Sequence, residues 1–139
     1  MNAERTQKPM APILAVVDDL FFVSKLQETA KQVGAELRVV RAADFRAESF
    51  RAAPPALAVF DLNATSANAV ELIRELKADA ELKQIPVIAF LSHVQVDLQR
   101  AAQAAGCDQV LPRSKFTAQL ADIFRRASAS DPRPATSDR

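Results

Sequence analysis

Short apolar runs alternate with segments of helical periodicity along the sequence, and this alternation constrains the fold more than any other feature. Four of the five runs are nearly continuous in apolar, largely β-branched residues. Runs of this kind are typical of parallel strands that are covered on both faces. The fifth run is short and is assigned as a strand by its position in the pattern. The expected strands are 13–17, 37–40, 57–60, 87–91 and 109–111.

The segments between these runs place apolar residues three or four positions apart, which is the spacing of helices that bury one face. A weaker helix is expected from Asp44, as its N-cap, to Ala52, because Pro54 follows and ends it. The four stronger stripes are Phe22, Leu26, Ala30 and Val33; Val70, Ile73, Leu76 and Ala80; Val94, Leu98, Ala101 and Ala105; and Phe116, Leu120, Ile123 and Ala127.

This order of elements predicts an α/β fold with a five-stranded, doubly wound parallel sheet, since right-handed crossovers place helices on both faces. Ligands of such sheets bind beyond the carboxyl ends of the strands. We expect one domain over 13–129. The polar segments 1–12 and 130–139 lack apolar periodicity and are expected to be flexible tails.

Composition excludes several classes of protein. The 18 basic and 17 acidic residues nearly cancel, which argues against nucleic-acid binding. No apolar run is long enough to span a membrane, and 1–12 has no signal-peptide core. The single Cys forms no internal disulfide and suits a cytoplasmic location. One Cys and one His exclude a Cys/His zinc site, and two Gly exclude a glycine-rich phosphate loop.

Acidic side chains follow the first and third expected strands. If these strands are neighbours, the carboxylates of Asp18, Asp19 and Asp61 converge at one edge of the sheet. Like charges at short range are costly, and Mg²⁺, which prefers oxygen ligands, relieves that cost. A spare carboxylate beside the metal could act as a nucleophile towards a phosphoryl donor. The plainer alternative is that Asp18 and Asp19 only cap the helix that follows.

Three segments resemble the receiver domains of bacterial response regulators: VVDD at 16–19, VFDLN at 59–63 and AAGCDQVLPR at 104–113. The resemblance extends over 13–127 and implies the flavodoxin-like strand order 2-1-3-4-5. It implies that Asp61 is the phosphoacceptor, and that Asp18, Asp19 and Asp61 bind Mg²⁺ together with the backbone carbonyl of Asn63. It also implies a histidine kinase or phosphotransfer protein as partner.

The sequence departs from this family on the phosphate-binding side of the site. Leu91 stands where Thr or Ser is usual, and Ser92 follows one position later. Arg113 stands where Lys is usual, and Lys115 is the other cation that could replace it. Val110 occupies the position of the aromatic switch residue. Arg113 and Ser92 are therefore the candidate phosphate contacts.

We predict a single-domain signalling protein, not an enzyme, that acts through contacts with an unidentified output protein and binds neither nucleic acid nor membrane. One alternative is a pseudo-receiver that binds partners without phosphorylation, with 94–115 as the first surface to examine. One residue of the pair Phe21 and Phe22 belongs to the core, and the other is free to serve a partner. A remote alternative is a haloacid-dehalogenase-like phosphatase, because AVFDLNAT at 58–65 is similar to its first motif, with Asn63 replacing the second Asp.

Overall fold

A five-stranded parallel sheet forms the centre of the protein. The computed structural model describes residues 11–93 and 95–129 of the 139-residue chain. The sheet has the order β3-β2-β4-β5-β6, which in chain order is 2-1-3-4-5 and confirms the expected fold. The strands are β2 (Ile13–Val16), β3 (Leu37–Val40), β4 (Leu57–Asp61), β5 (Val87–Leu91) and β6 (Gln109–Pro112).

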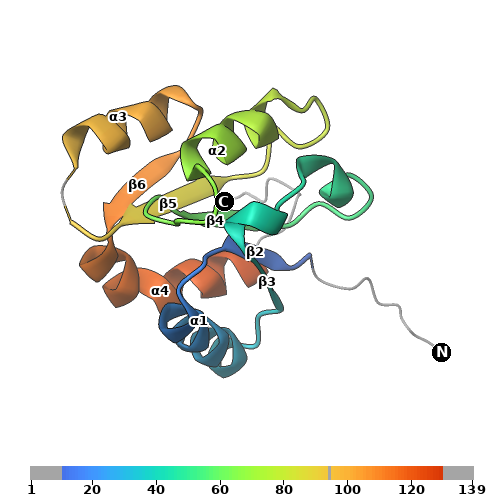
Figure 1. The fold of residues 1–139 in the computed structure, drawn as a ribbon. Coiled ribbons are helices and arrows are strands. Elements are labelled where there is room, and N and C mark those ends of the chain that lie inside the picture. The colour runs from blue at the N-terminus through green and yellow to red at the C-terminus, as the bar shows by residue number, and fades with distance from the viewer. Residues whose placement is uncertain (1–10, 94, 130–139) are drawn as a thin grey trace, which may run out of the picture.

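Helices cover both faces of this sheet (Figure 1). On one face α1 (Leu20–Val33) packs beside α4 (Arg113–Ala129). On the other face α2 (Ala69–Ala78) lies beside α3 (Val96–Ala104), and two 3-10 helices, η1 (Ala42–Asp44) and η2 (Ala47–Phe50), complete the layer. The two faces bury separate apolar clusters. No helix in the described parts of the chain has the length and apolar character needed to cross a bilayer.

The pairing of β2 with β4 positions the acidic residues. Ile13 aligns with Leu57 and Val16 with Phe60, so the two strands run in the same direction and end side by side. All five residues of β4 are buried, as expected for a central strand covered on both faces. The edge strand β3 is only partly buried, because it has a neighbour on one side alone.

The weak helix expected from Asp44 to Ala52 is absent and is replaced by η1 and η2. Asp44 is the last residue of η1, not a helix cap, and Phe45 has extended backbone angles. The break lets Phe45 and Phe50 stack with ring centroids 5.8 Å apart. Phe45 also packs edge-on against Phe60 of β4, at 5.6 Å. A continuous α-helix would place residues five positions apart on different faces.

The remaining helices agree with the predicted stripes, with small shifts in their ends. Helix α2 ends before Ala80, and α4 begins immediately after β6. Val94 of the third stripe lies outside the described residues. The expected tails also lie outside them, except for residues 11 and 12.

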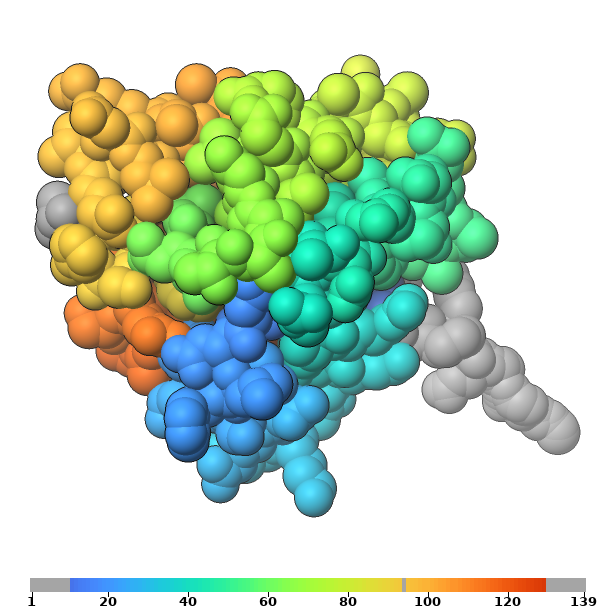
Figure 2. All heavy atoms as spheres, in the orientation of Figure 1, coloured from blue at the N-terminus to red at the C-terminus, as the bar shows by residue number. Residues whose placement is uncertain are grey.

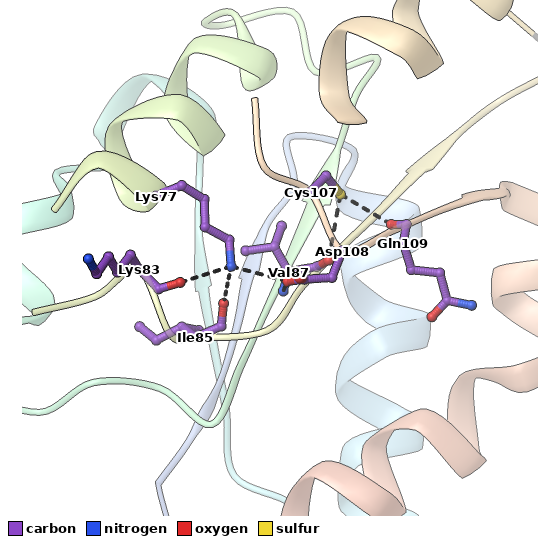
Figure 3. Close-up of polar contacts among 7 residues, drawn as sticks. All are labelled: Lys77, Lys83, Ile85, Val87, Cys107, Asp108 and Gln109. Carbon is purple, nitrogen blue, oxygen red and sulfur yellow. Dashed lines mark hydrogen bonds and ion pairs between the residues drawn. The ribbon is translucent and has the colours of Figure 1, made fainter. Parts of the chain in front are cut away.

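Lys77 joins three segments at the edge of the sheet where β5 and β6 begin (Figure 3). Its Nζ donates to the backbone carbonyls of Lys83 and Ile85, at 3.1 and 2.8 Å, and to Oδ2 of Asp108 at 3.1 Å. The same Asp108 oxygen accepts the backbone N–H of Val87 at 2.8 Å. This network is remote from the acidic residues and serves to fix the packing of α2.

Candidate functional site

A cavity of about 250 Å³ opens at the carboxyl edge of the sheet. The start of α1 meets the segments after β3 and β4 on the face shown in Figure 2. The cavity contains every site residue predicted from the sequence, whereas His93 and Lys115 do not line it. Its lining is Asp18, Asp19, Asp61, Asn63, Ala64, Thr65, Ser92 and Arg113.

Asp61 is the last residue of β4 and the buried acid of the site. Its exposed fraction is 7%, and its Oδ1 accepts the backbone N–H of Asn63 at 2.9 Å. Burial raises the pKa of this carboxyl above its ordinary value. The Asn63 hydrogen bond and the charge of Arg113 oppose that rise, while the nearby carboxylates of Asp19 and Asp18 add to it. Burial therefore makes the ionised form of Asp61 less favourable than in water.

Asp19 both caps α1 and reaches into the cavity. Its Oδ1 accepts the backbone N–H groups of Phe21 and Phe22, at 2.9 and 3.3 Å. Its Oδ2 accepts a hydrogen bond from Nη2 of Arg113 at 3.0 Å. That bond is the largest cause of a lowered Asp19 pKa. The helix-cap interpretation and the shared-pocket interpretation of this residue therefore both hold.

Arg113 is the first residue of α4 and lies against aromatic rings. Its guanidinium carbon is 4.3 Å from the centroid of the Phe22 ring and 5.8 Å from that of Phe90. The two rings are themselves in contact, with centroids 4.9 Å apart. The Arg113 Nε is buried and has no hydrogen-bond partner within the described part of the chain. Arg113, not Lys115, thus supplies the positive charge of the cavity.

Asp18 is turned towards two neighbouring loops. Its Oδ1 accepts the backbone N–H of Ala42 at 2.9 Å. Its Oδ2 accepts the N–H groups of Thr65 and Ser66, at 3.1 and 2.8 Å. Partial burial raises the Asp18 pKa, but these hydrogen bonds outweigh it and hold the pKa below its ordinary value. Asp18 therefore fixes the loops that frame the cavity.

The side chain of Asn63 links the loop after β4 to the loop after β5. Its Oδ1 accepts hydrogen bonds from both the backbone N–H and the hydroxyl of Ser92. Its Nδ2 donates to Oε1 of Gln95 at 2.9 Å. Gln95 occupies the N-cap position of α3, a position that Ser92 does not take. Gln95 was not among the predicted site residues, and no pattern in the sequence indicates it.

The residues that follow the sheet edge differ sharply in exposure. Leu91 is buried at 2%, whereas Ser92 and His93 are exposed.

Phe22 belongs to the core, and the adjacent Phe21 is 91% exposed. The expected division of the Phe pair is therefore confirmed.

The oxygen donors of the cavity fit a divalent cation such as Mg²⁺. Mg²⁺ binds one or two carboxylates and keeps several waters, and Asp19, Asp61 and the Asn63 carbonyl provide donors of this type. The donors are not gathered into a ready cage: across residues 11–93 and 95–129, no three His, Cys, Asp or Glu side chains are grouped closely enough to hold a metal. Asp19, one of these donors, is paired with Arg113.

Solved structures with the same fold are response regulator receiver domains. A phosphorylated cyanobacterial phytochrome response regulator, RcpA, is 24% identical, with TM-score 0.70 over 84% of this chain and 90% of that one. Chemotaxis protein CheY4 of Vibrio cholerae is 17% identical, with TM-score 0.73 over 86% and 99%. The receiver domain of a Pseudomonas aeruginosa sensor histidine kinase, solved with magnesium in its active-site cleft, is 18% identical, with TM-score 0.72 over 88% and 100%.

The chain therefore has the receiver-domain fold, as the sequence motifs indicated. No protein-family model matches the sequence, and a comparison with curated proteins gives no match either. The likeness is one of fold.

Proposed function

We propose that this chain is a receiver-type signalling protein that is phosphorylated on Asp61 by a histidine kinase or phosphotransfer protein and acts through protein contacts. The observation that carries the proposal is the placement of Asp61. It ends the central strand β4, is buried, and faces a cavity shared with two further carboxylates and one guanidinium. The fold supports this function because receiver domains have the same sheet order.

In the proposed reaction, a carboxylate oxygen of Asp61 forms a bond to the phosphorus of a phosphohistidine, and the P–N bond breaks. The electron pair of that bond remains on the imidazole, and the phosphoryl group becomes an acyl phosphate. Arg113 is the cationic group of this chain that would contact the phosphoryl oxygens, because its guanidinium can bind such oxygens in pairs. Ser92 lies at the cavity edge and is a weaker candidate contact.

Mg²⁺ is the proposed cofactor, held by Asp19, Asp61 and the Asn63 carbonyl, with Asp18 adding negative charge beside it. When bound, it neutralises negative charge on the transferring group. Asp18 uses both carboxylate oxygens for backbone N–H groups, so its main role in this chain is to hold the loops in place.

Partner contacts are proposed for the exposed apolar side chains at the starts of α1 and α3. Leu20 and Phe21 begin α1 and are 76% and 91% exposed, and Val96 begins α3 and is 51% exposed. Leu20 and Phe21 are adjacent in the chain, and contiguous exposed apolar groups are typical of protein-binding surfaces.

A pseudo-receiver remains the second candidate, and one observation favours it. The hydroxyl of Ser92, which directly follows β5, already donates a hydrogen bond to Asn63, so it is less available to contact a phosphoryl group. The phosphatase alternative has less support, because Asn63 cannot be a general acid and its side chain is hydrogen-bonded to Ser92 and Gln95.

The test is an amide NMR titration with Mg²⁺ and then beryllofluoride, which mimics an acyl phosphate on Asp. We expect shifts around Asp61 that extend to Ser92 and Arg113 in the wild type. The Asp61→Asn variant is the matched control, since it keeps the shape and replaces the nucleophilic carboxylate by a neutral amide. Mg²⁺ shifts without a beryllofluoride response would leave a metal pocket without phosphate chemistry. No response to either would favour the pseudo-receiver.

A further inference from the structure

The cavity at the carboxyl edge of the sheet contains its own cation. Its charged lining consists of three carboxylates and the guanidinium of Arg113. The Arg113 Nη2 lies 3.0 Å from Oδ2 of Asp19, in a pair that is only partly exposed on both sides. One oxygen of the Asp19 carboxylate is therefore already paired with a positive group of the protein.

Several contacts hold Arg113 in this position. The guanidinium lies over the face of the Phe22 ring at 4.3 Å, a cation–π distance, and within 5.8 Å of Phe90. Phe90 also stacks on Phe116 of α4, with centroids 4.8 Å apart, so the rings are fixed from both sides. The Arg113 side chain is 31% exposed, well below the exposure of a free surface cation.

Asp19 is equally fixed. Its other oxygen caps α1, so the carboxylate cannot turn away from Arg113 without breaking the bonds to Phe21 and Phe22. A metal ion that binds the Oδ2 of Asp19 must displace the guanidinium or share the oxygen with it. Two cations at one carboxylate oxygen repel each other, and the repulsion is stronger in a partly buried site than in water.

We propose that Arg113 is a built-in counter-ion that competes with the divalent cation for Asp19 and thereby sets the cation affinity of the cavity. This inference rests on the cation site of the proposed function and concerns what limits that site. Binding of the metal and pairing of Arg113 with Asp19 oppose each other, and such coupling is reciprocal. Whatever draws Arg113 away from Asp19 therefore strengthens cation binding.

The experiment measures the Mg²⁺ dissociation constant by amide NMR titration of the full chain. Arg113→Met removes the charge and keeps an apolar stem over Phe22. Lys115→Met is the matched control. It also removes one positive charge, two positions along the chain from Arg113, but the Lys115 side chain is exposed and does not line the cavity. We expect Arg113→Met to tighten Mg²⁺ binding by about tenfold, a usual size for such coupling. We expect Lys115→Met to change it by less than about twofold, since exposed charges are screened by salt.

A second readout needs no variant. The Nε–H signal of Arg113 in the wild-type protein should move during the Mg²⁺ titration, in step with the amide of Asn63, because the guanidinium leaves Asp19. An Nε–H signal that stays constant while Mg²⁺ saturates the site would overturn the inference.

The outcomes separate this inference from the proposed function. Equal Mg²⁺ affinity in the wild type and Arg113→Met overturns the competition and leaves the cation site standing. An equal gain in Mg²⁺ affinity in Arg113→Met and Lys115→Met also overturns the competition, because the gain then comes from the change in net charge. An absence of Mg²⁺ binding in all three proteins overturns the inference and the metal-dependent part of the proposed function together.

Discussion

The side-chain carbonyl of Asn63 accepts two hydrogen bonds from Ser92, one from the backbone N–H at 2.7 Å and one from the hydroxyl at 3.1 Å. The Asn63 backbone N–H donates to Asp61 at the same time. The proposed phosphoacceptor and the loop after β5 are thus joined through a single residue. A change at Asp61 that moves the Asn63 backbone also moves the start of the segment that leads to α3.

Asn63→Ala should release this loop. The Ser92 backbone N–H loses its partner, and one lost hydrogen bond of this kind lowers the free energy of unfolding by about 1 kcal/mol. We expect a lower melting temperature and faster hydrogen exchange at the Ser92 amide.

Ser92→Ala is the matched control, because it removes the hydroxyl bond and keeps the backbone bond. In this variant the backbone amide at position 92 should exchange its hydrogen at the wild-type rate. Unchanged exchange in Asn63→Ala as well would show that Asn63 does not hold the loop.

The gathering of the site residues was predictable, because Asp18, Asp61, Ser92 and Arg113 all lie at or just beyond the carboxyl ends of strands in one parallel sheet. Their hydrogen-bond partners were not predictable. The turn of Asp18 towards Ala42 depends on the path of the loop after β3, which has no periodic pattern. The position of Arg113 over aromatic rings depends on α4 beginning directly after β6, a boundary that the apolar stripe does not define.

Asp61→Asn should stabilise the protein at neutral pH. Burial raises the folded-state pKa of Asp61, so the folded state binds this proton more tightly than the unfolded state does. The contribution of Asp61 to folding stability therefore falls as the pH rises through its unfolded-state and folded-state pKa values. Above both values, the ionised carboxylate lowers the free energy of unfolding. Removing it should raise the melting temperature at pH 7 by roughly 3 to 6 °C if the cost is about 1 kcal/mol.

The gain from Asp61→Asn should shrink towards zero near pH 3, below the unfolded-state pKa of about 3.9, where the wild-type carboxyl is protonated in both states. Asp44→Asn is the comparison variant, because Asp44 is exposed and outside the cavity. Its effect should stay within about 0.5 kcal/mol at every pH. A stabilisation by Asp61→Asn that persists undiminished at pH 3 would contradict the burial argument.

Asp18→Ala should destabilise the protein, in contrast to Asp61→Asn, because the ionised Asp18 carboxylate stabilises the folded state. Its carboxylate accepts three backbone N–H groups, and hydrogen bonds to a charged acceptor contribute about 1.5–3 kcal/mol. The lowered folded-state pKa means that this stabilisation is present above pH 4 and is lost as the pH falls through the folded pKa. Chemical denaturation at pH 7 and pH 3 should show a larger loss at the first pH than at the second. An equal loss at both would assign the effect to packing.

The strands were readily predicted because buried parallel strands are short and continuously apolar. The weak point was the segment after β3. Its Phe45 and Phe50 are spaced for neither a helix face nor a strand face, and their burial is decided by contact with each other and with Phe60. Tertiary packing of this kind overrides local helix propensity, so the segment forms two short 3-10 helices.

Gly106→Ala should destabilise the protein through Lys77. Gly106 has φ +108°, and a Cβ there would lie 2.8 Å from Cγ of Lys77 and 3.1 Å from its Cβ. The Lys77 chain has little freedom to move, because its Nζ is fixed by Ile85, Lys83 and Asp108 (Figure 3). We expect a loss of roughly 2–3 kcal/mol by chemical denaturation, from backbone strain together with the displaced lysine.

Gly34→Ala separates the two contributions. Gly34 also has a positive φ, +76°, but a Cβ there would meet nothing within 4 Å, so this variant reports backbone strain alone. Its cost should be about 1 kcal/mol. If the contact with Lys77 matters, Gly106→Ala lowers the free energy of unfolding more than Gly34→Ala does. The difference between the two losses should shrink in a Lys77→Ala background, because the clashing Cγ is then absent. Equal losses in the two glycine variants would show that Lys77 yields without cost and that its network does not fix α2.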